Sequence, residues 1–122
     1  MPSSIESSYP VDPYLTDEEY RETFSRSVRA CADLVVCYQG GIILAKRNID
    51  PFIGTWSLPG GRLRYKVPIL ETAHNVAQGE LGVEVSIEDQ IGYIDYVNDG
   101  AYLHSASLVF LARVLSGIPR SK

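Results

Sequence analysis

The sequence predicts a single mixed α/β domain in which a short helix and three strands precede a second helix and three further strands. Apolar residues recur at helical spacing in two segments, one after Thr16 and one between Pro68 and Gly82. Short runs rich in β-branched and aromatic residues fill the intervals, and turn residues separate them. A chain of 122 residues has room for one core of this kind and not for two.

The amino-terminal part changes character near residue 14. Residues 1–13 are rich in Ser and Pro and show no periodicity, so we expect a flexible arm before a domain that spans residues 14–122. Thr16 and Glu19 have the spacing of a capping box, and apolar side chains follow at helical spacing. This pattern predicts a short helix at the start of the domain.

Three strands are expected next. The apolar runs 34–38 and 42–47 flank Gln39-Gly40-Gly41, which is the pattern of a β-hairpin. Residues 55–58 form a third short strand that leads into a Gly-Gly turn. We expect Trp56 to lie in the core, because a single Trp in a small domain usually buries its large area.

The second half of the chain predicts further strands. Residues 83–85 form a brief strand, and residues 91–97 alternate in part between two faces, which indicates a second strand. Asn98-Asp99-Gly100 is typical of a turn, and residues 102–115 read as a long strand dense in Leu, Val and Phe. The element order therefore describes an α/β domain with a mixed sheet.

The helix between Pro68 and Gly82 contains one unexpected carboxylate. Pro at a first helical position and Gly just past the last turn mark its two ends. At about 100° per residue, five apolar residues share one arc of about 140°, and Glu80 falls at its edge. These five residues are Leu70, Ala73, Val76, Ala77 and Leu81.

A carboxylate at the edge of a buried stripe costs several kcal/mol unless a positive group meets it. Three interpretations of Glu80 follow. An arginine of the preceding loop could pair with it, or Mg2+ could lie between it and a carbonyl of the Gly-Gly turn, since Mg2+ suits oxygen ligands and keeps several waters. In the third, the helix is rotated and Glu80 is a surface residue.

Composition limits the partners of the chain. A net charge of −4 leaves no basic stripe for a phosphate backbone, so we expect no nucleic acid. The loop with Arg62, Arg64 and Lys66 could still hold a small phosphate ester. No signal peptide or membrane span is apparent, and Cys31 and Cys37 lack a paired or metal-binding pattern, so we expect a cytoplasmic protein without a membrane partner.

The stretch from the diglycine to the end of the second helix resembles the Nudix box, which opens with a glycine, continues through a loop and ends in a helix with several glutamates. The positions that match the general pattern are Gly61, Glu80, Gly82 and Val83. The positions where glutamate or arginine is replaced are Val67, Asn75, Val76 and Gly79. The box is thus degenerate.

The match improves against one branch of the Nudix superfamily, the GDP-mannose mannosyl hydrolases, whose box reads Gly-Gly-Arg and ends in Glu-Leu-Gly. Residues 60–62 and 79–82 fit that branch without insertion or deletion. Upstream, residues 43–47 resemble its second strand, which ends in Lys-Arg, and residues 54–56 its Gly-x-Trp. The resemblance extends over residues 14–114, and the combination of motifs is specific.

The resemblance implies an α/β/α sandwich, although the chain would lack the last strand and closing helix of that fold. It implies Mg2+ held by the carbonyl of Gly60 and the carboxylate of Glu80. It gives Arg47 and Arg62 the role of sharing the charge of the diphosphate, and it makes Asp33 a substrate-binding residue of the first strand. The implied substrate is a nucleoside diphosphate sugar such as GDP-mannose, and the amino-terminal helix packs a homodimer in that branch.

Two other functions remain open. The run that supplies a second glutamate ligand and a histidine base in the resembling hydrolases has no counterpart here, and general-base assistance contributes about 100-fold to 10,000-fold. The chain could therefore be a catalytically degenerate Nudix domain that binds a nucleotide sugar without turnover. The third interpretation is a small-nucleotide pyrophosphatase, which would be expected to carry more box glutamates.

Overall fold

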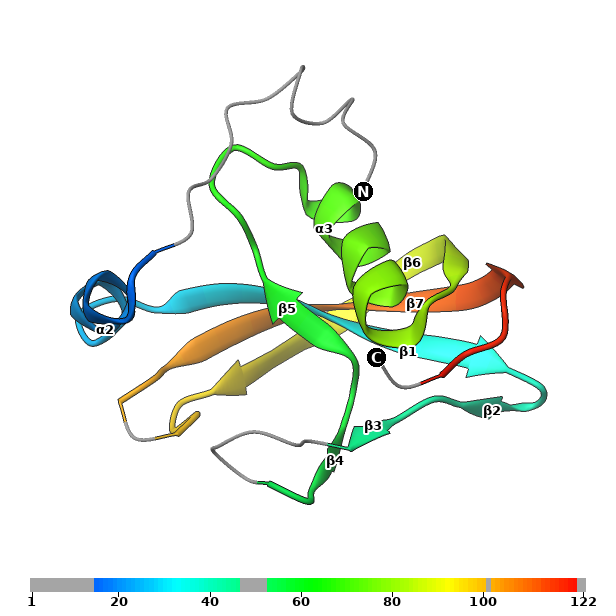
Figure 1. Cartoon of the computed structure of the whole chain (residues 1–122), viewed down its shortest axis with the longest axis horizontal. Helices are drawn as coiled ribbons and strands as arrows, with labels where there is room; N and C mark the ends of the chain where they lie inside the picture. Colours follow the sequence, from blue (N-terminus) through cyan, green and yellow to red (C-terminus); the bar gives the residue numbers. More distant parts are fainter. Residues whose placement is uncertain (1–14, 47–52, 101, 121–122) are drawn as a thin grey trace.

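The structure is a computed structural model that describes residues 15–46, 53–100 and 102–120. Its main layer is a five-stranded mixed sheet with a helix packed on one face (Figure 1). The strands of this sheet are β1 (Arg29–Tyr38), β2 (Gly41–Ile42), β5 (Gly60–Arg62), β6 (Glu84–Tyr96) and β7 (Ser105–Ser116). A separate two-stranded ribbon consists of β3 (Ala45–Lys46) and β4 (Trp56–Ser57). The predicted α/β class with a mixed sheet is confirmed.

Strand β1 organises the sheet. It runs parallel to β7 along most of its length, from the pair Arg29 and Ser105 to the pair Cys37 and Arg113. On its other edge it pairs antiparallel with β5 and, further along, with β2. Strand β6 lies antiparallel on the far side of β7. This arrangement places β5, which contains the diglycine, directly beside the centre of the sheet.

The predicted hairpin is present, but its second strand is short. Gln39 and Gly40 adopt φ angles of 50° and 81°, as a two-residue type I′ turn requires. The chain pairs with β1 only over Gly41–Ile42 and then leaves the sheet for the β3–β4 ribbon. Trp56 lies on this ribbon and is 63% exposed, so the expectation of a core Trp is wrong.

Helix α2 (Asp17–Phe24) begins as the sequence predicts. Thr16 accepts a hydrogen bond from the Glu19 amide, and the Glu19 carboxylate accepts one from the Thr16 amide, which completes the capping box. In Figure 1 the helix lies at one end of the sheet rather than over either face. None of its residues is buried.

The second predicted helix also has its expected ends, with a change of pitch in between. Pro68 is the N-cap of α3 (Ile69–Val76), which continues into one π-helical segment, η1 (Ala77–Leu81). Gly82 ends the segment with a φ of 69°, a left-handed conformation that glycine adopts at little cost. The fold therefore confirms one continuous helical element between the two residues that mark its ends.

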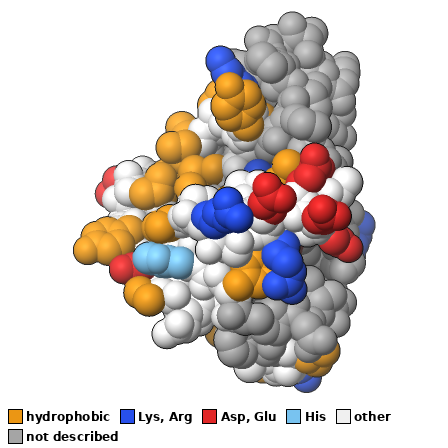
Figure 2. All heavy atoms as spheres, turned by 90° about the vertical axis from the view of Figure 1, so that its left-hand side faces the viewer, with side chains coloured by type: hydrophobic (Ala, Val, Ile, Leu, Met, Phe, Trp, Pro, Cys, Tyr) orange, Lys and Arg blue, Asp and Glu red, His pale blue; other side chains and the backbone are white. Residues whose placement is uncertain are grey.

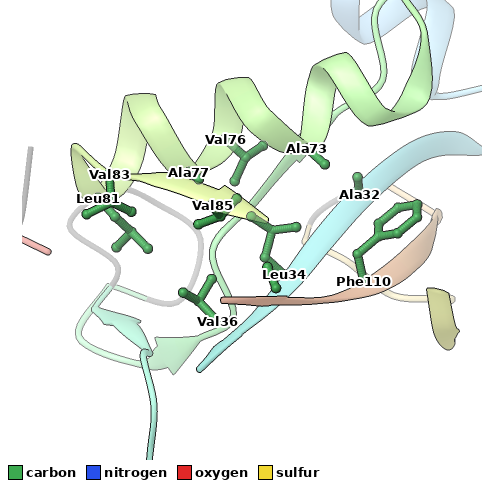
Figure 3. Close-up of a cluster of buried hydrophobic side chains, with 11 residues drawn as sticks. Ala32, Leu34, Val36, Ala73, Val76, Ala77, Leu81, Val83, Val85 and Phe110 are labelled. Carbon is green, nitrogen blue, oxygen red and sulfur yellow. The ribbon is translucent and has the colours of Figure 1, made fainter. Parts of the chain in front are cut away.

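The core lies between this helix and the sheet (Figure 3). It contains Ala32, Leu34 and Val36 of β1, Phe110 and Ala112 of β7, Val85 of β6, Ala73, Val76, Ala77 and Leu81 of the helix, and Val83. Four of the five helical residues of the predicted buried arc belong to it. Leu70 is 52% exposed, so the buried face of the helix does not include it.

The second half of the chain differs from the prediction in one respect. A single strand, β6, replaces the two expected strands, and three register shifts along its pairing with β7 absorb the residues that interrupt the alternation. Within the described residues, β7 is the last strand and no helix follows it. The expected arm over residues 1–13 lies outside the described ranges. In those ranges, no helix has the length and apolar character needed to span a bilayer.

Candidate functional site

The predicted Gly-Gly turn is in fact part of strand β5. Gly60 pairs with Asp33 and Gly61 with Ala32, both on β1. Because directly opposed residues of an antiparallel pair point to the same face, Gly60 and Arg62 share the face of Asp33. Gly61 faces α3 instead. The diglycine therefore lies between the helix on one face of the sheet and the Asp33 side chain on the other.

Both glycines are required by close packing. A Cβ at Gly60 would lie 1.8 Å from Oδ1 of Asp33 and 3.0 Å from the carbonyl oxygen of Ala32. A Cβ at Gly61 would lie 3.2 Å from a methyl of Val76 on α3. The first glycine thus gives room to a carboxylate on one face of the sheet, and the second lets the helix approach the other face.

The carbonyl of Gly60 points away from β1. The amide of Leu34 donates to the Pro59 carbonyl at 2.8 Å, and the amide of Leu63 donates to the Ala30 carbonyl at 2.9 Å. Hydrogen bonds in an antiparallel pair occur at alternate residues, so Gly60 occupies a non-hydrogen-bonded position. The β1 ladder does not use its carbonyl oxygen, which could therefore serve as a ligand.

Asp33 is held beside Gly60 in a polar environment under the sheet. Its side chain is 9% exposed, and the Tyr96 hydroxyl donates to Oδ2 at 3.0 Å. Burial raises the pKa of Asp33, although hydrogen bonds from Ser107 and Tyr96 oppose that rise. Burial together with the neighbouring Asp33 carboxylate raises the pKa of Tyr96 to about 12. Tyr96 therefore stays a hydrogen-bond donor over the physiological pH range.

Glu80 lies in the opposite layer, on the helical element that packs against β5 through Val76. It lies in η1, half-buried, four residues after the Val76 side chain that packs against Gly61. Figure 3 shows the helix running in the general direction of β1, with Ala73 toward Ala32 and Leu81 toward Val36. Glu80 follows Val76 by four residues and lies in η1, toward the end of the helix that runs in the direction in which β5 leads back from Gly61 to Gly60.

These positions confirm the expectation that Glu80 sits at the edge of the buried stripe. It is not an isolated charge in the folded chain. The prediction that Glu80 meets a cation remains untested.

The predicted cationic residues are placed in part. Arg62 shares the face of Asp33, donates to the carbonyl of Leu63 at 3.3 Å and lies over the Phe24 ring of α2, with its guanidinium carbon 5.7 Å from the ring centroid. Arg47 lies outside the described ranges. The structure thus brings Gly60, Asp33 and Arg62 to one face of β5, while Glu80 approaches from the other.

Two residues of this region were missed by sequence reasoning. Tyr96 carried a weak signal, because the alternation of residues 91–97 puts it on one face with Gly92 and Ile94. Its bond to Asp33 depends on a pairing of distant strands that no local pattern contains. Phe24 resembled any apolar residue of an amphipathic helix, and nothing in the sequence linked it to Arg62.

The donor set fits the expected type of magnesium site. In the described ranges, no group of three His, Cys, Asp or Glu side chains is placed to hold a metal ion. A carboxylate at Glu80 and an outward carbonyl at Gly60 are hard oxygen donors, and Mg2+ commonly takes one or two protein ligands with waters and substrate phosphates. The residues present are therefore compatible with Mg2+ held together with a phosphorylated substrate.

Comparison with solved structures identifies the fold as that of the Nudix hydrolases. The MutT Nudix hydrolase from Burkholderia pseudomallei is 28% identical, with a TM-score of 0.69 over 79% of this chain and 74% of that one. An ADP-ribose pyrophosphatase from Streptococcus suis has a TM-score of 0.62 at 20% identity, over 79% of this chain and 67% of that one. A UDP-X diphosphatase has a TM-score of 0.66 at 17% identity, over 89% of this chain and 55% of that one. The three likenesses show that the chain has the Nudix fold, and the likeness to the Burkholderia pseudomallei protein supports its place in that superfamily.

One curated protein adds a likeness at the level of sequence. The low-salt glycan biosynthesis protein Agl8 of Haloferax volcanii is 31% identical over 85 residues, which cover 70% of this chain and 54% of that protein. The chain thus spans about half the length of this relative. No protein-family model matches the chain.

Proposed function

We propose that the protein is a Nudix-type hydrolase of a nucleoside diphosphate derivative, with GDP-mannose or a related GDP-hexose as its substrate. One observation carries the proposal. Glu80 is half-buried in η1, the continuation of the helix whose Val76 packs against the diglycine strand, and the Gly60 carbonyl of that strand points away from β1. A carboxylate and a carbonyl that approach one strand in this way fit a cation and the diphosphate it accompanies.

In this proposal Glu80 and Gly60 hold Mg2+, which when bound neutralises charge on the diphosphate leaving group. Arg62 and Arg47 bind the phosphate oxygens, since guanidinium groups match phosphate geometry and stabilise charge that develops there. Asp33, on the Arg62 side of β5, binds the substrate next to Gly60. Weak activity is expected, because Val67, Val76 and Gly79 replace glutamates of the general box.

The loss of box residues favours attack at sugar carbon over attack at phosphorus. Val67 and Asn75 replace a glutamate and an arginine of the general box. In the resembling mannosyl hydrolases, water attacks the anomeric carbon, and that branch tolerates a reduced box. The glycan-biosynthesis name of the Haloferax volcanii relative also fits a sugar nucleotide better than a damaged free nucleotide.

A nucleotide-sugar binding module is the second candidate. It is favoured by the replaced carboxylates and would use the same side chains to bind without turnover. A small-nucleotide pyrophosphatase is the third candidate, and it would release a nucleoside monophosphate rather than a diphosphate.

We further propose that the protein acts in the cytoplasm, because the free thiols of Cys31 and Cys37 are typical of a reducing compartment. Homodimers packed through α2, as in the resembling branch, would be detected by sedimentation velocity. A monomer at every concentration would contradict that assembly.

The test is hydrolysis in H2 18O with Mg2+, using GDP-mannose and ADP-ribose in parallel. We expect GDP and mannose from GDP-mannose, with the label on the sugar. Label on phosphate, or a nucleoside monophosphate product, would support the pyrophosphatase. Binding of GDP-mannose without product after long incubation would support the binding module, and absence of both binding and product would reject all three.

A further inference from the structure

Helix α2 is attached to the sheet in an unusual way. None of its eight residues is buried, and only Tyr20 and Phe24 are half-buried, so the helix is not held by a deeply buried apolar face. Instead, its contacts pair aromatic rings with arginines. Figure 2 faces the end of the molecule that carries α2 and shows acidic and basic side chains side by side on that surface. Specific side-chain contacts therefore determine where the helix sits.

One chain of such contacts starts in the turn after β6. Asp99 and Arg29 form an ion pair at 2.9 Å, with only 25% and 20% of their side chains exposed. The Arg29 guanidinium also donates to the Ser105 hydroxyl at 3.0 Å and to the Tyr20 hydroxyl on α2. Arg29 therefore fixes Tyr20 relative to two strands of the sheet.

The same chain of contacts continues to the diglycine strand. The rings of Tyr20 and Phe24 meet edge to face, with centroids 4.8 Å apart. The guanidinium of Arg62 lies over the Phe24 ring at 5.7 Å from its centroid. Arg62 follows Gly60 by two residues and points to the same face. The aromatic pair thus links the partly buried ion pair of Asp99 and Arg29 to Arg62, which the proposed function takes as a ligand of the substrate phosphates.

We propose that Phe24, supported by Tyr20, is a positioning residue for Arg62. A flexible arginine loses side-chain entropy when it binds phosphate, and a ring that holds its guanidinium beforehand reduces that cost. Phe24 does not touch the substrate and acts only through Arg62. This inference rests on the proposed function, because it takes Arg62 as a ligand of the substrate phosphates.

The test is a double-mutant cycle on GDP affinity in the presence of Mg2+. Phe24→Leu keeps an apolar side chain and removes the ring, and we expect it to raise the Kd by about 3-fold, as for an exposed cation–π contact. Arg62→Gln should raise the Kd by about 10- to 100-fold. In the Arg62→Gln background, Phe24→Leu should change the Kd by less than about 1.5-fold.

A matched control removes a different contact of α2 and leaves the contact between Phe24 and Arg62 in place. Arg21 lies over the Tyr102 ring at 4.6 Å from its centroid and is a second attachment of the same helix. Arg21→Gln should leave the GDP Kd unchanged. If it raises the Kd as much as Phe24→Leu does, or if Phe24→Leu is equally harmful without Arg62, then Phe24 has only a structural role and the inference is overturned.

A second measurement does not depend on the nucleotide. The Arg62 side-chain N–H resonance should shift in Phe24→Leu through loss of the ring current, and it should not shift in Arg21→Gln. An unchanged resonance in Phe24→Leu would overturn the positioning role even if GDP binds. If the resonance shifts but the wild-type protein binds no GDP, the ring contact is real and the proposed function fails.

Discussion

Replacement of Gly60 by alanine tests the close packing of the diglycine strand against Asp33. The new Cβ would lie 1.8 Å from Oδ1 of Asp33, whereas ordinary contacts begin at 3.4 Å. The carboxylate must therefore move by about 1.6 Å, and this displacement breaks its 3.0 Å bond from Tyr96. Overpacking costs about 1–3 kcal/mol, and the lost hydrogen bond about 1 kcal/mol. We expect Gly60→Ala to lower the free energy of unfolding by about 2–4 kcal/mol.

Thermal denaturation followed by circular dichroism measures this loss. At about 4 °C per kcal/mol for a domain of this size, the Tm should fall by about 8–16 °C. Gly79→Ala is the matched control, because a Cβ there meets nothing within 4 Å. Alanine is the better helix former, so this variant should gain about 0.5–1 kcal/mol.

A background that lacks the carboxylate identifies the cause. In Asp33→Ala, the further change Gly60→Ala should cost about 1 kcal/mol or less, the remainder coming from the 3.0 Å approach to the Ala32 carbonyl. A Gly60→Ala protein as stable as the wild type would refute the packing of Asp33 against the diglycine. If Gly60→Ala costs about 2–4 kcal/mol in both backgrounds, the clash is not with the Asp33 carboxylate.

Three further predictions concern the same network and the end of the helix. Burial raises the pKa of Asp33, so the folded state holds this proton more tightly than the unfolded chain does; the resulting stability is present below the usual pKa and is lost as pH rises through the folded pKa. Asp33→Asn should therefore lose less stability than the wild type as the pH rises above about 4, the usual pKa of an aspartate, in denaturant titrations, and parallel curves would contradict the raised pKa. Because the pKa of Tyr96 is about 12, Tyr96→Phe should remove a component near that pH from the alkaline absorbance titration, and an unaltered titration curve would argue against it. Gly82→Ala places a side chain at a φ of 69° and should cost about 1 kcal/mol in chemical denaturation, whereas a neutral effect would exclude the left-handed cap.

Elements that are encoded locally could be predicted from the sequence. The capping box of Thr16 and Glu19 needs only residues three positions apart, and Pro68 and Gly82 mark helix ends through their own backbone preferences. The two-residue turn of the first hairpin has the same origin. The half-buried position of Glu80 agrees with the position expected from helical periodicity, although Glu80 lies within the π-helical segment η1.

Features that depend on tertiary pairing could not be predicted. The diglycine looked like a turn because glycine is common in turns, and its role as a close-packed strand appears only when β1 supplies Asp33 opposite it. Trp56 was expected in the core from its size, but its strand pairs with β3 outside the main sheet. The contact of Phe24 with Arg62 joins segments 38 residues apart and leaves no periodic signal.

The central claim is that Glu80 holds a cation beside a nucleoside diphosphate, and calorimetric titration of Mg2+ with GDP tests it most directly. The wild-type protein should bind GDP more tightly when Mg2+ is present, and Glu80→Gln should lose about 10-fold or more of that enhancement. Glu71→Gln, a carboxylate change in the first turn of the same helix, should retain it. Equal Mg2+-dependent binding by the wild type and Glu80→Gln would contradict the claim.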